Sequence, residues 1–390
     1  MRQVLQTSVR GGTRVLLAGL FIAAGHARLA AQEEEIDLGE GQSLEELTGE
    51  DAFPLQITGF GVAGYHYDGR TKENTFAGSK LAASLFRELS PQFWVFGQLT
   101  TLLEEPEGGE GADGGGGEVT TNTEIDNLIV NFTPTDLPQL SFFLGKFDSP
   151  LGFERDDEPL NLQPTTTFNF ELGRPIKLVG VGARWNFSPK VNLLAMVTNG
   201  WESQIDPNHG KTVGGRLGVL PTENSSVGIG GLFGPEGTQG DTHDRYLLSV
   251  DYSWQPRPDL IIAGEGNLGG DKNGIADGED ANWAGGTLTV FGRLAPRVGI
   301  TARGEVFDDK DGARTGVAQT LSSFSIAPAY FVGTGRNGIF SNVEHTTFRI
   351  PRFQVRGEIR FNHSTVDFFD TGGEPDNWDV QYIVQIVTAL

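Results

Sequence analysis

The chain contains no cysteine and only two methionines among its 390 residues. Without cysteine it can form no disulfide framework, no thiolate metal site and no lipid-modified N-terminal cysteine, and the composition is compatible with export to an oxidising compartment. After residue 30 the sequence also lacks any apolar run close to the roughly 20 residues that a transmembrane helix requires. If the protein spans a membrane, it therefore does so with strands.

Basic residues are scarce as well, since 29 Lys and Arg stand against 51 Asp and Glu, a formal net charge of −22. Residues 1–31 have the pattern of a secretory signal peptide, with arginines ahead of an apolar core that is too short for a membrane anchor. Cleavage after Ala27 or Ala31 fits this pattern. Removal of 1–31 takes away four Arg and no acid, so the mature net charge is −22 − 4 = −26. No nucleic-acid partner is expected, because phosphates require a basic patch.

Residues 32–54 are acidic and poor in apolar side chains, which predicts a disordered periplasmic lead-in. From residue 55 onward, segments of about ten residues alternate between apolar and polar side chains, the period of a strand. Sixteen segments fit, with the count fixed to within two: 55–67, 74–86, 92–103, 119–132, 140–147, 176–187, 191–199, 211–220, 226–234, 244–254, 259–268, 282–294, 297–307, 317–331, 352–362 and 378–389.

Period two alone does not separate a soluble sandwich from a membrane barrel. Three features favour the barrel. Tryptophans cluster at segment ends, as at Trp94, Trp185, Trp254, Trp283 and Trp378; arginines and acids share the polar face; and short turns alternate with long loops. We therefore predict an all-β fold, a transmembrane antiparallel β-barrel of about 16 strands over residues 55–390, with both chain ends on the periplasmic side.

The connection 148–175 is unusually long for a barrel and has no helical periodicity. We predict that it folds into the lumen and narrows it, with these charged residues as the constriction: Asp148, Glu154, Arg155, Asp156, Asp157, Glu158 and Glu171. Five of them are consecutive, and neighbours in an extended loop cannot all find protein partners. The surplus of acid is expected to face the permeation path and to favour cations weakly.

The polar face of the predicted strands supplies the facing lumen wall. Its candidate residues are Arg184, Arg216, Arg245, Arg293, Arg303, Glu305, Arg356, Glu358 and Arg360. In 176–187, by contrast, the residues on the predicted lipid face are Lys177, Val179, Val181, Ala183, Trp185 and Phe187. Arginine rings favour anions and acid rings favour cations, so a wall dominated by arginine would make an anion or phosphate-type porin instead.

Three motifs resemble those of the OmpL-like β-barrel porin family. They are the segment 145–154 (GKFDSPLGFE), the triplet 199–201 (NGW), and the segment 356–360 (RGEIR) followed by Ser364 and Phe369. The resemblance runs over most of the mature sequence. It implies an outer-membrane porin without naming a solute.

Two acidic, glycine-rich loops, 104–118 and 269–280, are expected to face outward. The second brings five oxygen-bearing side chains within reach of one cation, namely Asp271, Asn273, Asp277, Glu279 and Asp280. It lacks the fifth-position ligand and the final glutamate of an EF-hand, so we predict no metal site and no cofactor.

An outer-membrane lipase or protease is not favoured. His363 and Ser364 are adjacent, so in a strand they point to opposite faces and cannot pair as base and nucleophile. His243 with Asp244 and Asp241 is the only hint of a protease. We predict a non-enzymatic water-filled channel for passive diffusion of small hydrophilic solutes or ions, in contact with outer-membrane lipid. A non-conducting structural or adhesive barrel and a homo-oligomer such as a trimer remain open.

Overall fold

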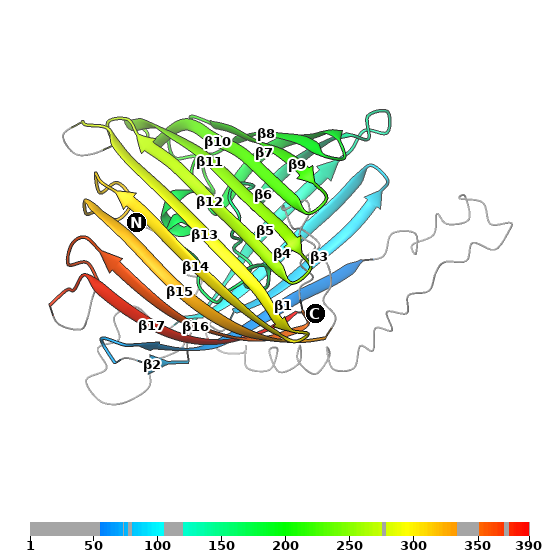
Figure 1. Cartoon of the computed structure of the whole chain (residues 1–390). Coiled ribbons are helices and arrows are strands. Elements are labelled where there is room, and N and C mark those ends of the chain that lie inside the picture. The colour runs from blue at the N-terminus through cyan, green and yellow to red at the C-terminus, as the bar shows by residue number, and fades with distance from the viewer. Residues whose placement is uncertain are drawn as a thin grey trace. The chain divides into compact units, whose positions relative to one another are not determined.

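The computed structural model describes residues 55–72, 74–76, 80–104, 120–274, 278–333, 351–369 and 374–389. These residues belong to the compact unit Phe53–Leu390. Its strands form one antiparallel sheet. The sheet closes on itself because β1 (Gln56–Asp68) pairs with β3 (Lys80–Ser90) on one side and with β17 (Trp378–Ala389) on the other (Figure 1).

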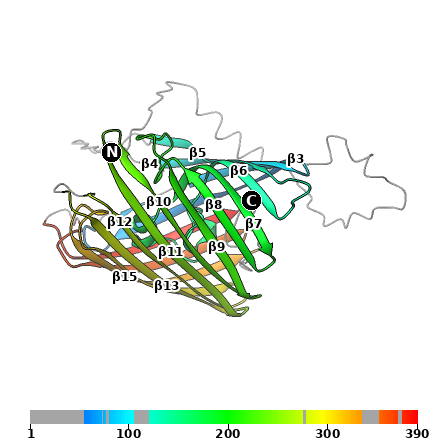
Figure 2. The same ribbon diagram turned by 90° about the horizontal axis from the view of Figure 1, so that it is seen from above.

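Sixteen strands build the wall of this barrel, and each pairs with its neighbours in chain order. Those between β3 and β17 are β4 (Phe93–Glu104), β5 (Thr120–Phe132), β6 (Leu140–Asp148), β7 (Lys177–Ser188), β8 (Val191–Thr198), β9 (Thr212–Thr222), β10 (Ser225–Thr238), β11 (Asp241–Arg257), β12 (Leu260–Asp271), β13 (Ala281–Ala295), β14 (Val298–Asp309), β15 (Gln319–Val332) and β16 (Phe353–Ser364). The two-residue β2 (Asn74–Thr75) adds to the edge of β1. Figure 2 shows β7, β8 and β9 side by side with β10 and β11.

The predicted barrel and its strand number are confirmed, since every predicted segment overlaps one wall strand. The largest boundary difference is at 74–86, where β2 comes first and the wall strand starts only at Lys80. Two helical elements, η1 (Glu158–Leu160) and α2 (Phe168–Gly173), lie between β6 and β7. Within the described residues, no helix is both long enough and apolar enough to cross a membrane.

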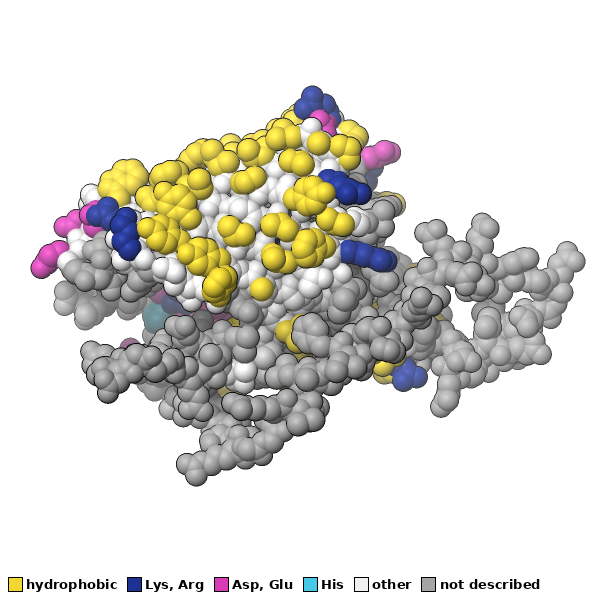
Figure 3. All heavy atoms as spheres, turned by 90° about the horizontal axis from the view of Figure 1, so that it is seen from below, with side chains coloured by type: hydrophobic (Ala, Val, Ile, Leu, Met, Phe, Trp, Pro, Cys, Tyr) yellow, Lys and Arg dark blue, Asp and Glu magenta, His cyan; other side chains and the backbone are white. Residues whose placement is uncertain are grey.

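The outer face of the wall is apolar. On β7, Val181, Trp185 and Phe187 are about half exposed, whereas Leu178 on the opposite face is fully buried. On β16, Ile359 is exposed and its neighbour Arg360 is buried, as predicted. Figure 3 shows hydrophobic side chains over the middle of one face and charged side chains near its ends, the distribution of a membrane-facing wall.

The two rims differ in the length of their connections. Two-residue turns at 91–92, 189–190, 223–224, 258–259 and 296–297 lie on the rim where β1 begins and β17 ends. The opposite rim carries long connections such as 149–176, 199–211 and 310–318, although the β10–β11 turn there is short. Bacterial barrels have short periplasmic turns and longer outer loops, so this pattern predicts that the second rim is the extracellular one. Most of 332–351 and of 104–118 lies outside the described residues.

The interior is less polar than predicted. Inward side chains of β6 to β11 form an apolar cluster of Phe147, Leu178, Leu194, Met196, Leu232 and Leu247. Leu151, from the connection after β6, packs into this cluster and is almost fully buried. The expectation of a water-facing wall is therefore wrong for this sector. The reason is that the inward connection needs an apolar surface against which to pack.

Candidate pore constriction

The connection 149–176 leaves the wall at Asp148 and returns at Lys177, which are paired across β6 and β7. Ser149 N donates to Ile176 O at 2.8 Å and closes the base of the connection. Farther along, its backbone carbonyls accept hydrogen bonds from inward side chains of the wall. Trp283 Nε1 donates to Gly173 O at 3.1 Å, and Thr301 Oγ1 donates to Leu162 O at 2.9 Å. The connection therefore runs inside the ring of strands (Figure 1).

Local sequence explains the shape of this connection. Pro159 lies in the first turn of η1, where no backbone donor is required, and α2 begins where the Thr167 Oγ1 accepts from Phe170 N at 3.0 Å. Gly152 has a φ of +78°, and a Cβ there would lie 2.4 Å from Arg174 Nε and 2.5 Å from Glu265 Oε2. Only glycine fits at this turn.

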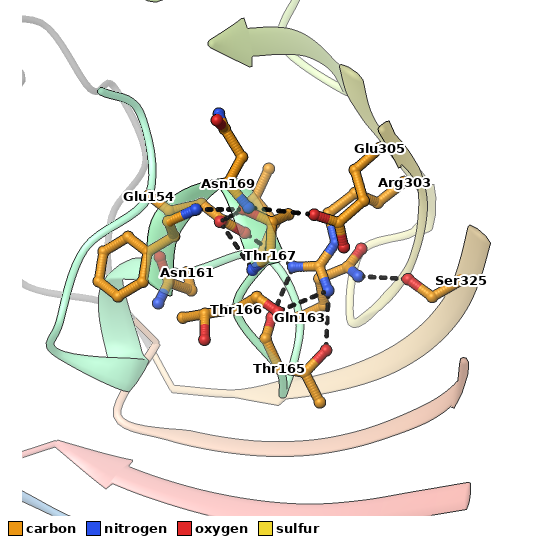
Figure 4. A network of polar contacts seen from close by, with 12 residues as sticks. Glu154, Asn161, Gln163, Thr165, Thr166, Thr167, Asn169, Arg303, Glu305 and Ser325 are labelled. Carbon is orange, nitrogen blue, oxygen red and sulfur yellow. Dashed lines mark hydrogen bonds and ion pairs between the residues drawn. The ribbon is translucent and has the colours of Figure 1, made fainter. Parts of the chain in front are cut away.

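A buried polar network joins the connection to β14, β15 and β16 (Figure 4). Arg303 donates through Nη1 to Glu154 Oε1 at 2.7 Å. Glu358 accepts from Gln163 Nε2 at 2.8 Å and from Thr165 N at 2.9 Å. On the wall itself, Arg360 Nη2 donates to Glu305 Oε1 at 2.9 Å.

A second set of buried charges lies next to it, on β9, β11 and β12. Arg216 forms a two-pronged pair with Asp251, at 3.1 and 2.7 Å. Glu265 accepts from Arg174 Nε at 3.4 Å and from Glu154 N at 3.2 Å. Together with Arg155, the two sets form what we name the anchor network. Its charged members are five arginines and five carboxylates, which cancel: Arg155, Arg174, Arg216, Arg303, Arg360, Glu154, Asp251, Glu265, Glu305 and Glu358.

Arg155 differs from the other arginines of this network. Its Nη1 donates to Glu154 O at 3.3 Å, while Nε and Nη2 have no partner in the described residues. Burial, together with the neighbouring Arg174 cation, lowers the pKa of Arg155 to about 10. The side chain remains charged at neutral pH.

The next residues of the connection belong to a different group, which we name the acid cluster: Asp126, Asp148, Asp156, Asp157 and Glu158, with Lys80 and Lys177. Lys177 Nζ lies 2.8 Å from Asp126, 2.5 Å from Asp148 and 3.0 Å from Asp156. Lys80 Nζ lies 3.2 Å from Glu158, and Gln98 Nε2 donates to Asp157 at 2.9 Å. With all groups ionised, the cluster has a net charge of 2 − 5 = −3.

The acid cluster has more access to water than the anchor network. The side chains of Asp148, Asp156 and Glu158 are 21%, 27% and 22% exposed, whereas those of Arg303 and Glu358 are 1% and 0% exposed. Because Lys80, Asp148 and Lys177 stand where β3, β6 and β7 reach the rim of the long connections, the cluster extends toward that rim.

The carboxyl groups of the connection differ in pKa. Burial raises the pKa of Asp157 to about 7, and the nearby Asp148 carboxylate adds to the shift. For Asp156 burial acts in the same direction, but the Lys177 and Lys80 ammonium groups outweigh it and lower the pKa. Burial also raises the pKa of Glu158, against the attraction of Lys80.

The expectation that these five neighbours cannot all find partners holds for Arg155 and is wrong for the acids. The acids each reach a different group, because irregular turns send successive side chains in different directions. Glu154 reaches Arg303, Asp156 reaches Lys177 and Glu158 reaches Lys80. Glu171 lies elsewhere, exposed on α2, where it accepts from Thr166 Oγ1 at 2.6 Å.

The predicted wall residues do not form one ring. Arg216, Arg303, Glu305, Glu358 and Arg360 belong to the anchor network, and Arg356 donates to Asn161 O at 2.8 Å. Arg245 pairs with Asp271 and stacks on Trp201 near the outer rim. Arg293 donates to Pro296 O at the β13–β14 turn, which lies on the rim of the two-residue turns. Arg184 lies on β7, toward that rim.

Sequence reasoning missed Lys177, Lys80, Asp126 and Gln98. The alternation of β7 predicts that Lys177 faces lipid, but Lys177 is the first residue of that strand, and its long side chain bends to the carboxylates. A signal was present, because Asp148 and Lys177 have opposite charges at the two ends of the connection.

The remaining candidates occupy ordinary positions. Asp271 of the predicted metal-free loop is held by Arg245, and Asp277 lies outside the described residues. Within the described residues no group of acids or histidines could hold a metal ion. Ser364 is buried and donates to Gln319 Oε1 at 2.7 Å, while His363 packs on Trp378. His243 lies 3.5 Å from Asp271.

Comparison with solved structures finds the same barrel in several outer-membrane proteins. The anion-selective porin from Comamonas acidovorans has 10% identity over 87% of this chain and 100% of its own, with a TM-score of 0.58. OmpT of Vibrio cholerae has 11% identity over 88% and 99%, with a TM-score of 0.57. Salmonella typhi OmpF, solved with daunomycin, has 9% identity over 86% and 97%, with a TM-score of 0.56. At such identities the likeness concerns the fold alone.

No curated protein matches the sequence. The family model described as "Putative beta-barrel porin-2, OmpL-like" matches residues 108–390, which include the whole connection and the wall from β5 to β17. This agrees with the resemblance of the 145–154 motif. The closed barrel, its apolar outer face and this match place the protein in the outer membrane, and the chain belongs to the OmpL-like β-barrel porin family.

Proposed function

We propose that this porin is a channel for passive diffusion of small hydrophilic solutes or ions, with weak selectivity for cations at low salt. The observation that carries the proposal is the contrast in charge between the two groups at the connection. The buried anchor network sums to zero, whereas the partly exposed acid cluster has a net charge of −3 when all of its groups are ionised. Only the second group has a surplus charge next to water.

We infer that solutes pass through the lumen beside β17. Inward residues of β14, such as Arg303 and Glu305, are buried beneath the connection, while Gln381 and Gln385 on β17 keep part of their surface exposed. Cations that pass between the connection and this side of the wall would meet the acid cluster first. A low-dielectric rim strengthens the field of such a cluster relative to bulk water.

The preference should depend on salt. At 0.1 M ionic strength the Debye length is about 10 Å, so the surplus charge acts across the lumen, and at 1 M it falls to about 3 Å and the charge is screened. We expect the ratio of cation to anion permeability to approach that of bulk solution at high salt.

The test is the reversal potential of the refolded protein in a planar bilayer under a KCl gradient. We expect the wild type to favour K⁺, and Asp156→Asn with Asp157→Asn to shift the potential toward anions. Glu171→Gln is the matched control, because this acid lies on the same connection but outside the cluster. An anion-selective wild type, or a double variant with the wild-type potential, would contradict the role of the cluster.

A non-conducting barrel is the second candidate, because the connection packs against both the apolar cluster and the anchor network. Single-channel conductance separates the two functions, since a plugged barrel would give no steps. The family and the fold point to a channel rather than an enzyme.

We further propose that residues 1–31 are removed as a signal peptide, that 32–54 form a periplasmic lead-in, and that lipid surrounds the barrel. A homo-oligomer such as a trimer is included in this proposal. Native mass spectrometry of the protein extracted from outer membranes would test the mature N-terminus and the subunit number together.

A further inference from the structure

Lys177 occupies a position that a free cation could take. Its ammonium group has three hydrogens to donate, and three carboxylates from three different segments lie within 3.0 Å of it: Asp126 of β5, Asp148 of β6 and Asp156 of the connection. The remaining charged neighbours are Asp157, Glu158, Lys80 and Lys146. Every donor of Lys177 is therefore taken by a carboxylate.

A buried amide lies beside Asp148. Asn127 is 2% exposed and donates through Nδ2 to Asp148 Oδ1 at 3.3 Å, while its own Oδ1 has no partner among the described residues. A buried acceptor without a donor is unfavourable, and it is the kind of group that a cation would satisfy. Asp148 and Asp156, at 21% and 27% exposure, leave the site open to water.

We propose that Lys177 sets the cation selectivity of the channel by filling a three-carboxylate cation site with its own ammonium group; this inference rests on the proposed function. As long as Lys177 is present, the site is occupied and part of the acid cluster is neutralised. Monovalent cations then pass a weakened field, and divalent cations find no vacant ligands.

Removal of the Lys177 ammonium group should change both the selectivity for monovalent cations and the binding of divalent cations. In Lys177→Gln the cluster has a net charge of 1 − 5 = −4. Three carboxylates that converge on one point within 3.0 Å would need to contract by only about 0.5 Å to reach the 2.3 to 2.6 Å of calcium–oxygen bonds. The variant is expected to bind a divalent cation in the lumen, and the wild type is not.

The experiment records K⁺ currents and reversal potentials of wild type and Lys177→Gln in planar bilayers at 0.1 M KCl, with and without CaCl₂. Without calcium we expect the ratio of K⁺ to Cl⁻ permeability to rise about fivefold in the variant, from one added negative charge near the path. Calcium at about 1 mM should then reduce the K⁺ current of the variant at least about twofold and leave the wild type nearly unchanged.

Two variants control for charge and position. Lys177→Arg keeps the cation and should behave like wild type. Lys190→Gln removes an exposed lysine of the β7–β8 turn, at the opposite rim from the cluster, and should also behave like wild type. A folded Lys177→Gln with the wild-type potential and no calcium effect would overturn the proposal, as would Lys177→Arg that matches Lys177→Gln.

If Lys177→Gln does not fold, the comparison of Asp126→Asn with Asp126→Asn/Lys177→Gln replaces it. The ratio of K⁺ to Cl⁻ permeability should be about fivefold higher in Asp126→Asn/Lys177→Gln than in Asp126→Asn. Equal reversal potentials of these two variants would contradict the inference. If the wild type does not conduct, the proposed function fails by itself. Calorimetric titration of detergent-solubilised Lys177→Gln with CaCl₂ then tests the site, with Asp156→Asn/Lys177→Gln as the variant that should not bind.

Discussion

The anchor network and the acid cluster meet within five residues of one connection. Glu154 turns into a dry, neutral set of charges against β14 and β16, and Asp156 turns toward water and a negative surplus. The same residue types therefore have two uses. In the first group each charge except Arg155 has a partner of opposite sign, and loss of one partner leaves the other unpaired. In the acid cluster the carboxylates outnumber the lysines, and the surplus negative charge acts on ions that pass through the channel.

The largest effect should come from breaking a pair in the anchor network. Arg303→Met leaves Glu154 and Glu358 buried without their cation, and removal of one partner of a buried pair costs about 3 to 5 kcal/mol. We expect a matching loss in the free energy of unfolding in urea, and faster protease cleavage of 149–176.

The matched control is Arg257→Gln. Arg257 is 66% exposed and pairs with Asp259 at 3.4 Å, so its loss should cost under about 1 kcal/mol. If both variants were equally stable, the anchor network would not hold the connection in place.

A smaller effect is expected from the turn that directs the connection into the network. Gly152→Ala would place a methyl group 2.4 Å from Arg174 Nε at a φ of +78°, and such strain costs about 1 to 3 kcal/mol. Gly292→Ala is the control, since a Cβ at that strand position meets no atom within 4 Å. Urea unfolding of the two variants gives the difference. Equal midpoints would mean that this turn tolerates a side chain.

The wall could be predicted from the sequence because membrane strands repeat every two residues, and that signal is local. The inward orientation of Arg303, Arg356 and Arg360 followed from the same period. The partners did not follow, because Glu154 and Arg303 are about 150 residues apart and no short-range pattern links them.

The apolar sector of the interior was missed for a different reason. The stretch 193–197 reads Leu-Leu-Ala-Met-Val, apolar on both faces, which is typical of a strand buried on both sides. The sequence therefore contained this signal, but a lumen lined only by water would leave no surface for the inward apolar residues to pack against. Lys177 was misplaced because alternation fails at a strand end, where a long side chain can bend toward charge.

The smallest expected effect is a change in selectivity with pH, and it sharpens the contrast between the two groups. Asp157 has a pKa raised to about 7 by burial and by Asp148, so its carboxyl group is charged above pH 7 and neutral below it. Between pH 8 and pH 6 the acid cluster should therefore change from −3 toward −2, while Asp156, whose pKa Lys177 and Lys80 lower, stays ionised. Cation preference at 0.1 M KCl should weaken about twofold over this range.

Asp157→Asn tests the assignment of that titration, because it removes this carboxyl group and leaves the others of the cluster: Asp126, Asp148, Asp156 and Glu158. Its reversal potential should stay nearly constant from pH 8 to pH 6 and lie close to that of the wild type at pH 6. Stability should move the opposite way to cation preference. Since the folded state holds the proton more tightly than an unfolded Asp with a pKa of about 3.9, the contribution of Asp157 to stability falls as pH rises through about 7. If the pH dependence of the reversal potential persisted in Asp157→Asn, the titration would belong to another group. Glu158 would be the next residue to replace, because burial raises its pKa as well.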